Sequence, residues 1–126
     1  PGGVRIGTAD IYNVCERLPQ VADCLAFGRP VGDDEEIVLC LQMAGGAAAT
    51  SELAKEIRTR LRQECSPRHV PAAIYTVGAV PYTISGKRVE GAAKSAALGE
   101  EVRNKASLAN PESLGDYAGL SQREAL

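Results

Sequence analysis

Apolar residues recur at helical spacing in three stretches of the chain, separated by shorter runs with a different pattern. The first stretch begins after Thr8, a good N-cap residue, and the second begins at Thr50 or Ser51 and extends to about Cys65. The third stretch is rich in alanine and ends at Gly99. These stretches predict helices, and their apolar positions are Ile11, Val14, Cys15, Leu18, Leu53, Ile57, Leu61, Val89, Ala92, Ala93 and Ala96.

Three apolar runs without helical spacing predict strands at residues 21–27, 37–41 and 73–77. The second run is apolar throughout, which implies that both faces of that strand are covered. Residues 32–35 predict a turn between the first two runs, so we expect those two strands to pair antiparallel.

The elements follow the order helix, strand, strand, helix, strand, turn and helix, which predicts an α+β fold for residues 1–99. We expect a small central, mainly antiparallel sheet of about three strands, with a hairpin-like turn and with helices flanking both faces. Residues 100–126 are more polar and form a C-terminal extension, in which Asn110 followed by Pro111 predicts one more short helix.

Composition limits the classes of protein to which the chain can belong. Its 126 residues suffice for one domain with its own core, and 44% apolar and 24% charged residues are ordinary values for a globular domain. No apolar run approaches about 18 residues, so no membrane-spanning segment is expected. The chain begins Pro-Gly-Gly without an initiator methionine, and we therefore expect it to be part of a longer protein.

Charge and cysteine content exclude further classes. A net charge of −2, with one Phe, four Tyr and no Trp, argues against a nucleic-acid-binding protein. The four cysteines form no Cys-x-x-Cys pair and His69 is the only histidine, so we expect no metal site. Cys24 and Cys40 lie in apolar runs, where a free cysteine packs as a small hydrophobic residue. Reduced thiols are typical of a cytoplasmic protein, which is the location we expect.

Residues 81–87 read Pro-Tyr-Thr-Ile-Ser-Gly-Lys and are the leading candidate for a functional site. A proline and a glycine enclose a small polar run, which can hold the Lys87 ammonium group at the tip of a tight turn, where it suits a phosphate. An ordinary exposed loop lysine is the alternative. The segment is not a P-loop, because Pro81 stands where that motif needs glycine and Arg88 where it needs serine or threonine.

Two other segments have both a functional and a plain interpretation. The glycine-rich residues 1–7 would let the backbone approach a ligand or another chain closely, and a simple turn has the same composition. Lys55, Arg58 and Arg62 share one face of the second predicted helix, as either a solvated surface or an anion site. The acidic residues 33–36 fit a hydrated turn better than a metal site.

Three blocks of the sequence resemble the C-terminal domain of the acyl-CoA synthetase (adenylate-forming) superfamily. Residues 3–11 are similar to its glycine-arginine segment after the interdomain hinge, and residues 62–71 to the end of its long helix and the connector that follows. Residues 81–87 are similar to its C-terminal lysine motif. A departure is Asp10, where relatives commonly have glutamate. The resemblance implies a lid domain over residues 1–99 and a large N-terminal domain that is absent from this chain.

The resemblance also implies a two-step reaction with roles for four residues. A carboxylate and ATP give an acyl-adenylate and diphosphate, and CoA then takes the acyl group. Lys87 matches the adenylation lysine, and Arg5 matches the arginine that faces the nucleotide phosphate. Gly3 matches the glycine beside which the pantetheine arm of CoA passes, and Arg62 matches an arginine that contacts a CoA phosphate in acetyl-CoA synthetases.

Within the superfamily, residues 2–8, 66–71 and 102–114 resemble the acetoacetyl-CoA synthetases, which implies acetoacetate as the acid. Another short-chain enzyme, an acetyl- or propionyl-CoA synthetase, is the alternative. A small nucleic-acid-binding module that uses the basic residues of the second helix with Lys87 and Arg88 is the rival from a different class.

The substrates and partners follow from the same resemblance. ATP and CoA are expected as substrates, with Mg accompanying ATP and bound mainly by the chain's own N-terminal domain, so the isolated chain should be inactive. Many relatives with a Pro-x-x-x-x-Gly-Lys motif are acetylated on the lysine, which implies that an acetyltransferase and a deacetylase act on Lys87. No membrane or nucleic-acid partner is expected.

Overall fold

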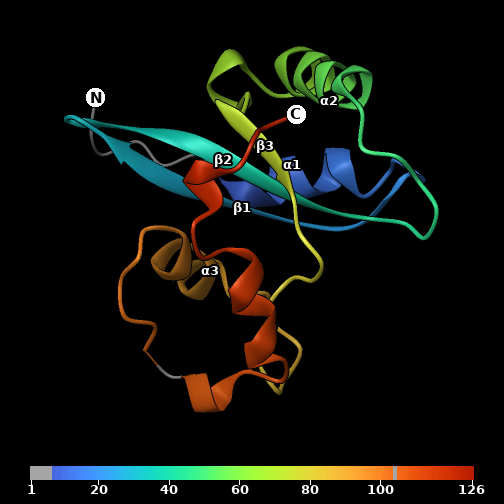
Figure 1. The fold of residues 1–126 in the computed structure, drawn as a ribbon. Helices are drawn as coiled ribbons and strands as arrows, with labels where there is room; N and C mark the ends of the chain where they lie inside the picture. The colour runs from blue at the N-terminus through green and yellow to red at the C-terminus, as the bar shows by residue number, and fades with distance from the viewer. Residues whose placement is uncertain (1–6, 104) are drawn as a thin grey trace.

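The computed structural model describes residues 7–103 and 105–126, so the sequence-based assignments of Gly3 and Arg5 lie outside the described residues. Three helices and three strands follow the order that the sequence predicts (Figure 1). They are α1 (Thr8–Cys15), β1 (Val21–Val31), β2 (Asp34–Met43), α2 (Ser51–Glu64), β3 (Ala73–Thr76) and α3 (Glu90–Ala97). Short 3-10 turns at Pro67–His69, Lys105–Ser107, Pro111–Asp116 and Leu120–Gln122 complete the described chain.

The strands form one mixed sheet in the order β1-β2-β3. β1 and β2 pair antiparallel from Val21 opposite Met43 to Val31 opposite Asp34, which confirms the predicted pair. β3 pairs parallel with β2, an arrangement that the long connection through α2 permits. The antiparallel pair is the longer part of this α+β sheet, as expected.

The turn between β1 and β2 is shorter than the sequence predicts. Only Gly32 and Asp33 lie outside the strands, and Gly32 has a φ of +59°, a conformation that glycine adopts readily. The acidic residues that follow begin β2. There Glu36 forms an ion pair with Arg29 on the opposite strand, with 2.6 Å between Oε1 of Glu36 and Nη2 of Arg29. This cross-strand pair explains why polar residues extend the strands beyond the apolar runs.

Both faces of the sheet are covered, as the uninterrupted apolar run of β2 implies. Alternate strand residues, among them Ala26, Leu39 and Ile74, pack on one face against α1 and α2. Their neighbours, among them Phe27 and Cys40, pack on the other face against α3 and the C-terminal extension. In Figure 1, α2 and α3 lie on opposite sides of the sheet.

The C-terminal extension is packed onto the domain. Tyr117 and Leu120 are almost completely buried in the core of the second face, and Leu108 and Leu114 pack against Ala92 of α3. The backbone N–H of Leu126 donates to the carbonyl of Ile74 at 2.8 Å. The extension therefore runs from α3 across the second face to β3 (Figure 1).

None of the helices in residues 7–103 and 105–126 is long and apolar enough to cross a membrane. The same residues contain no group of three or more His, Cys, Asp and Glu side chains placed to hold a metal ion. All four cysteines are free thiols, and Cys24 and Cys40 are buried in the sheet, as expected.

Candidate functional site at the Lys87 hairpin

Residues 82–88 form a small hairpin, here called the lysine hairpin. Tyr82 and Arg88 pair as antiparallel neighbours at its base, and the Thr83 N–H donates to the Lys87 carbonyl at 2.8 Å. At the tip, the Gly86 N–H donates to the Thr83 carbonyl at 2.9 Å. Gly86 has a φ of +91°, which explains why glycine precedes the lysine.

Lys87 is exposed at this hairpin. Its backbone N–H donates to the Thr83 hydroxyl oxygen at 2.9 Å, so the main chain at the lysine is fixed. Its ammonium group has no hydrogen-bond or ion-pair partner among residues 7–103 and 105–126. The lysine thus combines an ordered backbone with a charge that is available to a ligand or to another domain.

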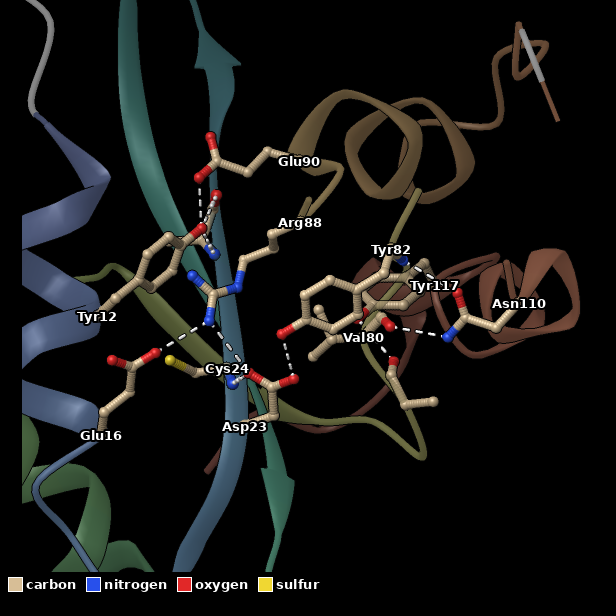
Figure 2. Close-up of polar contacts among 12 residues, drawn as sticks. Tyr12, Glu16, Asp23, Cys24, Val80, Tyr82, Arg88, Glu90, Asn110 and Tyr117 are labelled. Carbon is tan, nitrogen blue, oxygen red and sulfur yellow. Dashed lines mark hydrogen bonds and ion pairs between the residues drawn. The ribbon is translucent and has the colours of Figure 1, made fainter. Parts of the chain in front are cut away.

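Arg88 anchors the base of the hairpin to α1 and β1. Its guanidinium group lies over the ring of Tyr12, 3.9 Å from the centroid, and forms ion pairs of 3.0 Å with Glu16 and 3.2 Å with Asp23 (Figure 2). Burial alone would lower the pKa of Arg88, but the hydrogen bonds to the two carboxylates outweigh it and raise the pKa. Arg88 is therefore a permanently charged bridge beneath Lys87.

Two tyrosines extend the anchor. The Tyr82 hydroxyl donates to Asp23 at 2.6 Å, and the Tyr12 hydroxyl donates to Glu90 at the start of α3. The Tyr12 oxygen also accepts a 3.0 Å hydrogen bond from the backbone N–H of Ala26 in β1. Burial, aided by the Glu90 carboxylate, raises the pKa of Tyr12 far above its usual value, so this hydroxyl keeps its proton. The network joins the hairpin, α1, β1 and α3 into one rigid unit (Figure 2).

Arg62 lies away from the lysine hairpin. It is exposed in the last turn of α2, a helix that covers the first face of the sheet, whereas Tyr82 of the hairpin packs on the core of the second face. Arg58 of the predicted basic stripe is engaged within the domain, because its Nε donates to the carbonyl of Pro71 at 3.2 Å. The contacts of the lysine hairpin run to α1 through Arg88 and to the second-face core through Tyr82, and none of these contacts is to α2.

Asp10, the position that departs from the family pattern, is exposed in the first turn of α1. Its carboxylate lies 3.3 Å from Nε2 of His69, and Nδ1 of His69 lies 2.8 Å from the Ser66 hydroxyl. This contact joins α1 to the connector after α2, and it lies outside the network around Arg88.

From the sequence, Arg88 was expected to contact a ligand only in the nucleic-acid-binding alternative, and its role as the anchor of the hairpin was not predicted. One signal was available, because neighbouring residues in an extended strand point to opposite sides. A lysine that points outward at position 87 predicts an arginine that points inward at position 88. The partners of Arg88, which are Tyr12, Glu16 and Asp23, carry no comparable signal, since they come from distant parts of the chain.

The site can perform one kind of chemistry, which is to present a fixed positive charge. Among the described residues, the Lys87 ammonium group has no hydrogen-bond or ion-pair partner that would neutralise its charge. A positioned ammonium group stabilises negative charge that develops on a reacting oxygen. The hairpin is therefore a candidate site that presents a positive charge to a ligand or to another domain.

Comparison with known proteins agrees with this arrangement. A family described as the AMP-binding enzyme C-terminal domain matches residues 11–87. An acetoacetyl-coenzyme A synthetase of Rhizobium meliloti (strain 1021) is 48% identical over 122 residues, covering 97% of this chain and 19% of the relative. An acetoacetyl-CoA synthetase of Caenorhabditis elegans is 48% identical over 118 residues, covering 92% and 17%.

Solved structures give the same result. An acetoacetyl-CoA synthetase from Streptomyces lividans superposes with a TM-score of 0.81 at 34% identity, covering 94% of this chain and 18% of that one. An acyl-CoA synthetase of Brucella canis gives a TM-score of 0.61 at 30% identity, covering 68% and 16%. The chain thus spans about a fifth of the length of the relatives it matches. The resemblance inferred from the three sequence blocks is confirmed, and the chain belongs to the family of AMP-binding enzyme C-terminal domains.

Proposed function

We propose that this chain is the C-terminal lid of an AMP-forming acid–CoA ligase that converts acetoacetate, ATP and CoA into acetoacetyl-CoA, AMP and diphosphate. The observation that carries the proposal is the exposed, unpaired Lys87 ammonium group on an anchored hairpin. Acetoacetate is supported by the relatives of that name, whose similarity covers up to 97% of the chain and so includes the C-terminal extension.

In the first step, a carboxylate oxygen of acetoacetate attacks the α-phosphorus of ATP, and diphosphate leaves to give the acyl-adenylate. The phosphoryl oxygens carry the charge of the transition state, and stabilising them is the main task of the protein. Lys87 would supply one such charge from the lid. Its lack of an internal partner supports this role, because a competing ion pair would have to break first.

In the second step, the sulfur of CoA attacks the acyl carbonyl, and AMP leaves as the thioester forms. We assign Arg62 to a phosphate of CoA, for which its planar guanidinium group is suited. The pantetheine arm of CoA would pass beside Gly3, and Arg5 would face the nucleotide phosphate. Both assignments rest on the sequence resemblance alone. Arg62 and Lys87 lie on separate elements, α2 and the lysine hairpin, which supports a lid that uses a different part of its surface in each step.

The remaining substrate sites belong to the N-terminal domain, which would bind acetoacetate and most of ATP with its Mg. Isolated from that domain, the chain would have no activity. We place the enzyme in the cytoplasm, in keeping with four free thiols in the chain. The exposure of Lys87 also makes it available to a protein acetyltransferase, and acetylation would remove the charge that the first step needs.

The test is product analysis on the intact enzyme that contains this chain. Acetoacetate, acetate and propionate are compared by their kcat/KM, and the nucleotide and phosphate products are separated. Acetoacetate should give the highest kcat/KM, with AMP and diphosphate as products. A preference for acetate or propionate would overturn the assignment of the acid, and formation of ADP and phosphate would overturn the reaction class.

A further inference from the structure

The C-terminal extension adds a third strand to the lysine hairpin. The Ile84 N–H donates to the Ser107 carbonyl at 3.0 Å, and the Ala109 N–H donates to the Tyr82 carbonyl at 2.9 Å. Thr83 and Leu108 pair as antiparallel neighbours between these two bonds. The side of the hairpin that faces the extension is thereby covered, and three consecutive residues of the hairpin are tied to the extension.

Asn110 closes this pairing with its side chain. Its Nδ2 donates to the Val80 carbonyl at 2.9 Å, and its Oδ1 accepts from the Tyr82 N–H at 3.0 Å (Figure 2). The residue between these two groups is Pro81, which is buried and has no N–H of its own. An asparagine side chain offers a donor and an acceptor at a short reach, so a single residue fixes both backbone groups.

Two more side chains of the extension hold the segment just before Val80. The Tyr117 hydroxyl donates to the Ala79 carbonyl at 2.9 Å, and Oδ2 of Asp116 accepts from the Gly78 N–H at 2.8 Å. Tyr117 has no exposed surface, so the extension is itself fixed to the core. The chain that leads into the hairpin is consequently held by the extension from Gly78 to Tyr82.

We propose that Asn110 is a positioning residue for the adenylation step, acting through the backbone of residues 80–82 on the location of Lys87. The inference rests on the proposed role of Lys87. A charge stabilises a transition state only where it is placed, and a displacement of about 1 Å can cost about 100-fold in rate. Arg88 fixes the chain that leaves the hairpin, and Asn110 fixes the chain that enters it.

The proposal makes a selective prediction. Both hydrogen bonds of Asn110 go to the chain that enters the lysine hairpin, and neither goes to the sheet or to α2, where Arg62 lies. Loss of the Asn110 side chain should therefore disturb the lysine hairpin and adenylation, and leave α2 and thioester formation unchanged. A merely structural role would lower both half-reactions together, through loss of folded enzyme.

The test uses the full-length enzyme and measures the half-reactions separately. Adenylation is followed as acetoacetate-dependent exchange of diphosphate into ATP, and thioester formation is followed from supplied acetoacetyl-AMP and CoA. Asn110→Ala should lower kcat of the exchange by about 10- to 100-fold, with little change in the KM for ATP or in thioester formation. Asn13→Ala, at an exposed position on α1, is the matched control and should leave both rates unchanged.

Tyr117→Phe is the second variant, because it removes one hydroxyl and keeps the buried ring. It should lower the exchange selectively, by about 3- to 10-fold, the value of one hydrogen bond. Equal losses in both half-reactions for Asn110→Ala and Tyr117→Phe, or no loss in either, would overturn the positioning role.

Lys87→Ala, measured in parallel, separates this inference from the proposed function. If Lys87→Ala lowers the exchange rate but not thioester formation, while Asn110→Ala and Tyr117→Phe do not show this difference, only the positioning role is wrong. If Lys87→Ala does not lower the exchange rate more than thioester formation, the proposed function is wrong and the positioning role fails with it.

Discussion

Replacement of Arg88 by alanine should destabilise the domain more than replacement of any other described arginine by alanine. The reason is that Arg88 joins the lysine hairpin to α1 and β1. The ion pair with Asp23 involves side chains that are only 19% and 21% exposed, and a hydrogen bond between charged groups contributes about 1.5 to 3 kcal/mol. Glu16 is 52% exposed, so solvent screening limits that pair to about 0 to 1 kcal/mol.

The contact between the guanidinium group and the Tyr12 ring adds about 1 kcal/mol. Against these gains, Nε of Arg88 is buried without a hydrogen-bond partner among residues 7–103 and 105–126, which lowers the total. We expect Arg88→Ala to reduce the free energy of unfolding by about 3 kcal/mol, a large part of the typical stability of a domain.

Urea denaturation of the 126-residue chain, followed by circular dichroism, measures this loss as a lower midpoint. Arg68→Ala is the matched control, since Arg68 is exposed and only its backbone N–H takes part in a hydrogen bond. The control should change the free energy of unfolding by no more than about 0.5 kcal/mol. A loss below about 1 kcal/mol for Arg88→Ala would refute the anchoring role.

Three further predictions concern different parts of the domain. Arg62→Glu in the full enzyme should raise the KM for CoA by about 10- to 100-fold, the value of a charged hydrogen bond, and leave adenylation intact. Arg103→Glu, an equal charge change at another exposed site, is the control. An unchanged KM for CoA in Arg62→Glu would exclude the CoA role. Burial raises the pKa of Cys40 to about 12, so the unfolded chain loses this thiol proton first as the pH rises. The free energy of unfolding should therefore fall above about pH 9, by up to about 1.4 kcal/mol per pH unit for this group. In Cys40→Ala the free energy of unfolding should fall less steeply with pH. Equal slopes of this free energy against pH in the two proteins, measured by urea denaturation, would contradict the prediction. Mass spectrometry after treatment with a protein acetyltransferase should find Lys87 modified and adenylation lost in proportion; an enzyme that remains fully active when Lys87 is modified would contradict the proposed charge requirement.

The sheet and the helices that cover it were predictable because their signals are local and periodic. The uninterrupted apolar run of residues 37–41 indicated cover on both faces, and α1, α2 and α3 supply it. The exposure of Lys87 was likewise expected from a turn that glycine closes. Burial patterns with a regular period are visible in a single sequence because they do not depend on distant contacts.

The anchoring network was not predictable, because it joins residues far apart in the chain. Arg88 contacts Asp23 across 65 positions and Glu16 across 72. Several partners could have neutralised this arginine, and only the packed fold selects among them. The short turn at Gly32 and Asp33 has the same origin, since the pair of Arg29 with Glu36 lengthens the strands.

The C-terminal extension is a second part of the site that sequence reasoning left open. Apart from the short helix expected after Asn110, no element was predicted in it, and the structure builds it from 3-10 turns. Its buried apolar residues are Leu108, Leu114, Tyr117 and Leu120, and the last three recur at every third position, the period of a 3-10 helix rather than that of an α-helix or a strand. Only their packing on α3 and the second face reveals that the extension supports the lysine hairpin.

The most direct measurement is the ratio of the two half-reactions in a Lys87→Ala variant of the full-length enzyme, with Lys94→Ala on α3 as the matched control. Loss of one positioned charge should lower acetoacetate-dependent exchange of diphosphate into ATP by about 100- to 1,000-fold. Thioester formation from supplied acetoacetyl-AMP and CoA should stay within a factor of about two of the unmodified enzyme, as should both rates in the control. Equal loss of the two half-reactions in Lys87→Ala, or loss of neither, would contradict the assignment of this hairpin to adenylation.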